Sequence, residues 1–182
     1  MPITWTNNPD ADRLLETDGL ALLIGLVLDQ QVPMEKAFSG PFELKKRLGK
    51  LDAAEIARMD PAKLDKIFRE RPALHRFPGS MARRVQALCE LLVSQYGGKA
   101  ENVWAGAADG KELAARIRKL PGFGDMKVKI TVAVLAKKWN VQPSGWEGEA
   151  AHWHTVADVD SPETMAKARD VKRAMKAKAS AR

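Results

Sequence analysis

Apolar residues recur along much of the chain at the spacing of α-helices. In residues 111–119 and 126–139 they return every three or four positions, which is typical of amphipathic helices. Residues 20–28 are apolar at almost every position, which indicates a helix buried on all sides. No segment alternates apolar and polar residues convincingly enough to predict a strand, and no internal repeat is visible. The pattern therefore predicts an all-α fold.

Prolines, glycines and capping residues set the bounds of the remaining helices. Asp60-Pro61 and Ser161-Pro162 each place a capping side chain before a proline in the first helical turn, and Ser80 is expected to cap a long helix. A break is expected at Ser39-Gly40-Pro41. Residues 147–159 carry no clear signal. Besides the segments above, helices are expected over 34–38, from the break to 48, over 53–58, 61–70 and 81–96, and after Pro162.

The stretch Leu120-Pro121-Gly122-Phe123-Gly124 joins the two amphipathic segments. Proline ends the first helix, and the two glycines permit a tight turn with positive φ. Such a turn leaves the first backbone N–H groups of the second helix unpaired, which suits a bound phosphate. The alternative is an ordinary loop between two antiparallel helices.

Composition and charge narrow the class of protein. The 182 residues fit one compact unit, and the apolar run at residues 20–28 is too short to span a bilayer. No charged and apolar leader opens the chain, so a cytoplasmic location is expected. Cys89 is the single cysteine, which excludes an internal disulfide and a four-cysteine iron–sulfur cluster.

The net charge of +7 lies mainly at the C-terminus. Residues 163–182 hold seven basic and two acidic residues, so they contribute +5 and leave +2 for the rest. A basic terminal helix is either a solvated end or a segment that follows a phosphate backbone. His152-Trp153-His154 holds two histidines too isolated to favour a transition-metal site.

Three motifs together resemble a known family. The Leu-Pro-Gly-Phe-Gly string between two helices resembles the helix-hairpin-helix of the DNA glycosylases related to endonuclease III, the HhH-GPD superfamily. Leu28-Asp29-Gln30-Gln31 is similar to the family's helix that ends in a base-stack-filling glutamine. Residues 79–85 are similar to a helix start found about forty residues before the hairpin. The resemblance covers roughly residues 18–142. More narrowly, the chain resembles a small, mainly actinobacterial group of base-excision-repair-like proteins without assigned substrates.

The resemblance implies a two-lobed fold that holds double-stranded DNA in a cleft. One lobe is a helical bundle over 18–130 that ends in the helix-hairpin-helix at about 111–139. The second lobe combines residues 1–17 with 140–182, including the basic helix. A monomer that requires no cofactor and contacts no membrane is expected. In the family, carbonyls of the hairpin turn often hold a monovalent cation. The matching carbonyls here, which would hold K⁺ or Na⁺, belong to Arg118, Leu120 and Phe123.

The same resemblance assigns DNA contacts. Backbone amides of the turn would bind a phosphate, two lysines of the following helix would add charge, Gln31 would fill the emptied base stack and Phe77 would act as an apolar wedge. The alternatives are that Gln31 only ends a helix and that Phe77 only packs in the core. The expected DNA-binding residues are Gln31, Phe77, Gly122, Phe123, Gly124, Lys127 and Lys129.

The catalytic pattern of the family is incomplete. The nucleophilic lysine of its bifunctional members is replaced by Met126, and Lys127 lies about 100° further around the helix. No aspartate is present at 141–144, where catalytic members place one. Asp29 and Glu147 are therefore the candidate catalytic carboxylates, with Glu149 near the second. The sequence favours a monofunctional DNA glycosylase, and the alternative is a non-catalytic DNA-binding protein on a degenerate glycosylase fold.

Overall fold

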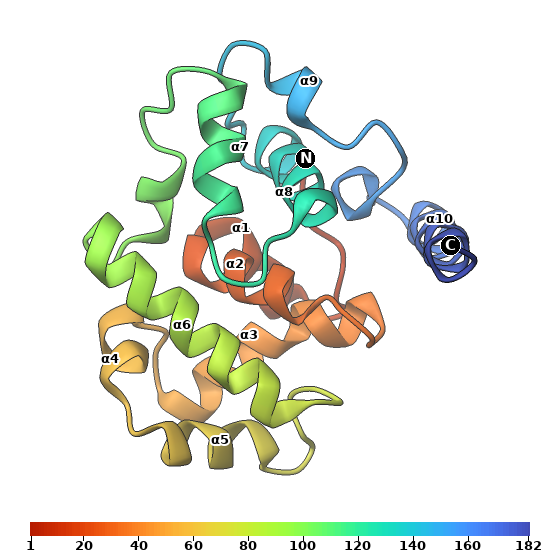
Figure 1. Cartoon of the computed structure of the whole chain (residues 1–182). Helices are drawn as coiled ribbons and strands as arrows, with labels where there is room; N and C mark the ends of the chain where they lie inside the picture. The colour runs from red at the N-terminus through yellow and green to blue at the C-terminus, as the bar shows by residue number, and fades with distance from the viewer.

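The computed structural model describes all 182 residues and contains helices but no strand, which confirms the all-α prediction (Figure 1). Two of the twelve elements are short 3₁₀ helices, η1 and η2. The elements are α1 (Pro9–Thr17), α2 (Gly19–Leu28), α3 (Met34–Leu48), α4 (Ala53–Arg58), α5 (Pro61–Arg69), α6 (Pro78–Tyr96), η1 (Ala100–Val103), α7 (Gly110–Arg118), α8 (Asp125–Lys138), α9 (Trp146–Glu149), η2 (Val156–Asp158) and α10 (Pro162–Ser180).

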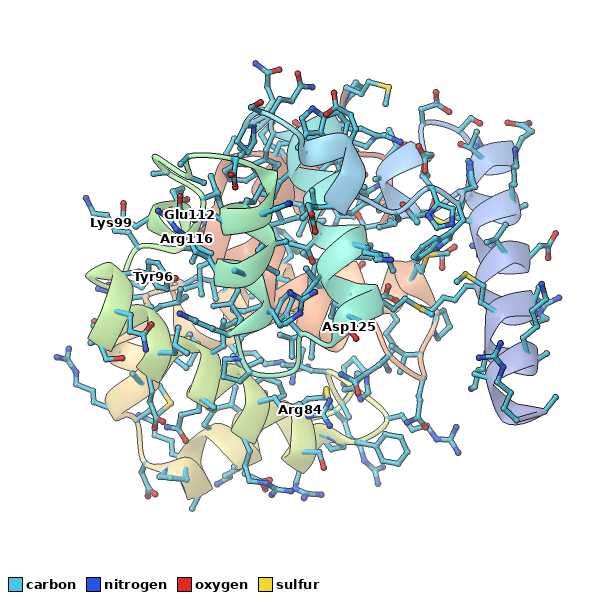
Figure 2. The ribbon with its side chains drawn as sticks, turned by 45° about the horizontal axis from the view of Figure 1, so that its top comes forward. Arg84, Tyr96, Lys99, Glu112, Arg116 and Asp125 are labelled. Atoms are coloured by element: carbon cyan, nitrogen blue, oxygen red, sulfur yellow. The ribbon has the colours of Figure 1, made fainter.

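Helix α2 lies at the centre of the molecule, and all of its residues are buried. Helices α3 to α6 gather at one end of the view in Figure 1, and α7 to α9 gather at the other. One continuous core of 47 buried residues runs from Ile3 to Ala168, so both ends of the chain contribute to it. The basic helix α10 stands at the side of this body (Figures 1 and 2). The expected lobe boundaries stay a prediction.

Several local predictions are confirmed because capping chemistry is encoded in a few adjacent residues. Asp60 caps α5 through its side chain as predicted, and Asp18 and Asp52 cap α2 and α4 in the same way. Ser161 caps α10 in a reciprocal capping box with Thr164. No helix is both long and apolar enough to cross a membrane.

The predicted break at Gly40-Pro41 is wrong, because α3 runs without interruption from Met34 to Leu48. A Cβ atom added at Gly40 would lie 2.4 Å from Cδ1 of Leu28, so this glycine permits close packing of α3 on α2. Residues 9–17 form a helix that the apolar pattern does not predict, with Asn8 as its side-chain cap.

The start of α6 also differs from the prediction. The helix begins at Pro78, and Ser80 lies inside its first turn instead of capping it. Phe77 occupies the capping position, although it makes no side-chain cap hydrogen bond. Proline at the first helical position explains the earlier start, because its fixed φ suits a helix and its missing N–H has no partner there in any case. Phe77 is therefore held directly at a helix end.

Candidate DNA interface and catalytic residues

The turn between α7 and α8 has the backbone expected of a phosphate-binding hairpin. Gly122 has a φ of 87°, in the left-handed region that glycine tolerates. Gly124 is the N-cap residue of α8, and it has no side chain that could bond the first amides of the helix. The amides of Gly122 and Gly124 donate to no atom of the protein. The amide of Phe123 instead donates to the carbonyl of Leu120 at 3.1 Å, while its ring is buried. Phe123 therefore anchors the turn, and the two glycines present free donors.

Charged residues flank this turn. The carboxylate of Asp125, at the first position of α8, accepts a 3.2 Å hydrogen bond from Nε of Arg118. The pair offsets a negative charge that would otherwise repel a phosphate at the turn. Met126 follows with 49% of its surface exposed. The carbonyls of Arg118 and Phe123 accept no hydrogen bond inside the protein, whereas that of Leu120 accepts one. A monovalent cation on these carbonyls stays a prediction.

Two side chains donate to backbone carbonyls at the C-terminal end of α2. Nζ of Lys127, from α8, donates to the carbonyl of Leu26 at 2.5 Å. Nε2 of Gln30 donates to the carbonyl of Val27 at 2.8 Å. These bonds satisfy carbonyls that the helix end leaves without backbone donors. They also fix the turn that follows α2, where Gln31 is exposed with a φ of 56°.

Lys127 therefore makes its contact inside the protein. The pKa of its ammonium group is lowered to about 8, chiefly by burial and also by the positive charges of Lys172 and Arg84, while the charge of Asp29 opposes the shift. Its expected contact with a DNA phosphate stays a prediction. Lys129 is half-buried, and its carbonyl accepts the amide of Ala151 at 2.9 Å.

Arg84 of α6 lies between the turn after α2 and the hairpin. Its Nη1 donates to Oε1 of Gln30 at 2.8 Å, and a Cβ atom added at Gly122 would lie 3.9 Å from its Cδ. Arg84 and Asp125 lie on the same face of the molecule in Figure 2. No role for Arg84 could be predicted from the sequence, because nothing in its own segment reveals a partner 54 residues away. Its exposed guanidinium adds positive charge between the two expected DNA contacts.

Phe77 is on the surface, which excludes the alternative that it packs in the core. Its side chain is 40% exposed, and the guanidinium of Arg76 lies 5.3 Å from the centre of its ring. Its amide donates to Nδ1 of His75 at 2.9 Å. Nε2 of the same histidine lies 3.1 Å from the carbonyl of Leu28 and 2.9 Å from that of Gln30. The loop that carries Phe77 is thus joined to the turn that carries Gln31.

The two candidate carboxylates lie in different places. The side chain of Asp29 is 12% exposed and accepts a 2.5 Å hydrogen bond from Nζ of Lys172. Glu147 is exposed on α9, which packs near the start of α7, where the amide of Gly110 donates to the carbonyl of Ser144 at 2.8 Å. The hairpin turn follows the opposite end of α7, and the two ends of this helix lie about 13 Å apart. Only Asp29 therefore lies beside the turn that carries Gln31.

The single cysteine and the remaining histidines lie outside this site. Cys89 is fully buried in α6, and burial raises the pKa of its thiol to about 12. His154 donates from Nε2 to the carbonyl of Thr164 at 2.9 Å. No group of three or more histidine, cysteine or acidic side chains is placed to hold a metal ion.

Comparison with known proteins identifies the family. The model of the HhH-GPD superfamily base excision DNA repair proteins matches residues 24–178. This range covers most of the chain, from the central helix through the hairpin and into α10. No curated protein and no solved structure matches the chain. The chain belongs to the HhH-GPD superfamily of base excision DNA repair proteins.

Proposed function

We propose that the protein is a monofunctional DNA glycosylase, which hydrolyses the N-glycosidic bond of a damaged base in duplex DNA. The observation that carries this proposal is the way three elements are brought together. His75 bonds the amide of Phe77 and the carbonyl of Gln30, the residue before Gln31. Arg84 bonds the side chain of Gln30 and lies beside the hairpin at Gly122. A protein that only held duplex DNA would have less need of exposed wedge side chains beside its phosphate site.

Each part of the interface suits one step of base removal. The free amides of Gly122 and Gly124 are donors for a backbone phosphate. The exposed ring of Phe77 suits insertion between base pairs, and Gln31 suits the space left by an extruded base. Extrusion costs a few kcal/mol, and contacts of this kind offset that cost.

Asp29 is the carboxylate best placed for the chemistry. A carboxylate beside the extruded nucleotide would stabilise positive charge on the sugar or activate the attacking water. Asp29 is two residues from Gln31 and mostly shielded from solvent, whereas Glu147 is exposed beside the far end of α7. Because Lys172 occupies one oxygen of Asp29, we expect this ion pair to open or shift when DNA binds.

No covalent amine intermediate is part of this proposal. The side chain at the position of the family's nucleophilic lysine is Met126, which has no amine. We also propose that the protein has no iron–sulfur cluster, because Cys89 alone cannot ligate one. We further propose that it acts as a monomer. A K⁺ or Na⁺ ion on the hairpin carbonyls would be its only bound metal.

The experiment is a measurement of base release from duplexes that carry alkylated, deaminated or oxidised bases, with protein in excess over DNA. The proposal expects release from at least one class of lesion, with an intact abasic strand as product. The second candidate is a DNA-binding protein that recognises damage without cutting, and the lack of an acidic residue at 141–144 favours it. Tight binding to damaged duplexes without release of any base would establish that second function.

A further inference from the structure

Both ring nitrogens of His75 take part in hydrogen bonds. The side chain is buried, with 1% of its surface exposed, in the loop between α5 and α6. Nδ1 accepts the amide of Phe77, and Nε2 faces the carbonyls of Leu28 and Gln30. One of these partners, Phe77, carries a side chain expected to enter DNA, and another, Gln30, directly precedes Gln31, which carries the second.

These partners define one protonation state. A carbonyl only accepts hydrogen bonds, so Nε2 carries the proton and shares it between Leu28 and Gln30. A backbone N–H only donates, so Nδ1 has no proton where it faces Phe77. The ring is therefore the neutral tautomer protonated at Nε2. A second proton on Nδ1 would place two N–H groups against each other.

No other hydrogen bond joins the loop at 70–77 to the turn at 29–33. Arg47 also holds this loop, through the carbonyl of Pro72, but it ties the loop to α3 rather than to the turn. Arg84 of α6 also donates to the side chain of Gln30, but from a position seven residues beyond Phe77. Within the loop that carries Phe77, the imidazole of His75 therefore sets its placement relative to Gln31.

We propose that His75 is a positioning residue for base extrusion, which in its neutral form sets the wedge Phe77 against the stack-filling Gln31. This inference rests on the proposed function, because it assigns His75 to the extrusion step of that reaction. It adds a requirement for the protonation state of a residue that contacts neither phosphate nor reacting atoms.

The surroundings of the ring favour the neutral form. Burial lowers the pKa of His75, and the cationic groups that act on it, Lys36 of α3 and Lys127 of α8, lower it further. The two carbonyls oppose this shift. No acidic group is among the causes that raise this pKa. Extrusion should therefore be constant near neutrality and decline as the pH falls below the ordinary histidine range and the ring gains its second proton.

The test is the fluorescence of 2-aminopurine placed in a mismatched pair of a duplex, because this base brightens when it leaves the stack. The variants are His75→Ala, His75→Gln and, as matched control, His152→Gln, which changes an exposed histidine outside the loop at 70–77 and the turn at 29–33. Glutamine can still donate to the two carbonyls but does not titrate near neutrality. Binding is measured on the same duplex by anisotropy, and folding by circular dichroism.

The parent should show a fluorescence rise that declines in acid, and the control should match it. His75→Ala should lose about tenfold in the equilibrium for extrusion, as expected for broken buried hydrogen bonds, while binding changes less. His75→Gln should retain part of the rise and lose its acid dependence. Should the alanine variant not fold, the glutamine variant and the parent's pH profile still decide the matter.

One outcome overturns the inference alone, and another overturns it together with the proposed function. If the parent extrudes the base but both His75 variants match it in amplitude and pH profile, His75 has no positioning role. If the parent binds without extruding any base, the proposed function fails, and the role of His75 fails with it.

Discussion

Lys172 in α10 donates a 2.5 Å hydrogen bond to Asp29 at the end of α2, which joins residues 143 positions apart. Arg169, one turn earlier, pairs with Glu35 at the start of α3. Helix α10 buries only two of its residues, and these ion pairs add two further links to the body. The most basic segment of the chain is thereby fixed beside the turn that carries Gln31.

This placement predicts that the exposed end of α10 contributes to DNA binding by charge alone. In the double variant Lys176→Ala, Lys178→Ala, the slope of log K against log[salt] should become shallower by up to about 1.8, since each lost phosphate contact removes about 0.9. The parent slope should lie near −4 to −5 if about five phosphates are engaged. The control is Lys63→Ala, Lys66→Ala on α5, which removes the same charge from another exposed helix. Equal slopes for the two double variants would exclude a role for α10.

The hairpin can be tested at Gly124. A Cβ atom added there meets no heavy atom within 4 Å, so Gly124→Glu should fold normally. It would place a carboxylate where a phosphate is expected, and affinity for duplex DNA should fall at least about tenfold by repulsion and loss of the site. Gly148→Glu in α9 is the matched control, because that position is also open. Unchanged binding by Gly124→Glu, with intact helical signal, would refute the hairpin assignment.

The hairpin was predictable because its chemistry is local: a proline and two glycines in five residues determine the turn. The caps at Asp60 and Ser161 were predictable for the same reason. The roles of Arg84 and His75 were not, because each depends on partners from elements more than forty residues away. The uninterrupted α3 was missed because close packing of Gly40 on Leu28 outweighs the local preference of a Gly-Pro pair for a break.

A third prediction concerns covalent trapping. Borohydride should trap no protein–DNA complex in the parent, because Met126 supplies no amine and the amine of Lys127 is bound to the carbonyl of Leu26. Met126→Lys is the positive control, since this position is exposed and accommodates a longer polar side chain. The measurement is a gel of borohydride-treated reactions with an abasic duplex. A trapped parent complex in which peptide mapping finds Lys127 would show that this amine reaches the sugar.

Burial of Lys127 predicts a stability effect with a definite sign. Its pKa is about 8 in the folded protein and near its ordinary value when unfolded, so the folded state binds fewer protons between these two values. The free energy of unfolding should therefore rise with pH above about 8. At neutral pH the buried charge lowers the free energy of unfolding by up to about 3 kcal/mol, and its hydrogen bond restores about 1 kcal/mol of this.

Lys127→Met should accordingly be about 1–2 kcal/mol more stable than the parent at pH 7, with the difference shrinking toward pH 10. Urea unfolding at several pH values measures it. Lys129→Met, two residues away on the same helix, is the control and should show no such pH-dependent difference. A Lys127→Met protein that is less stable than the parent at every pH would contradict the account of this buried ammonium.

The most direct test of the glycosylase account is the rate of base release by Asp29→Asn, under single-turnover conditions, on whichever lesion the parent processes. Asparagine keeps the size of the side chain and removes its charge. We predict a loss of about a hundredfold or more for Asp29→Asn and a rate close to the parent's for Glu147→Gln, with DNA binding retained in both. Release by Asp29→Asn at the parent rate would contradict the assignment of this carboxylate, and a parent that releases no base from any lesion would contradict the glycosylase itself.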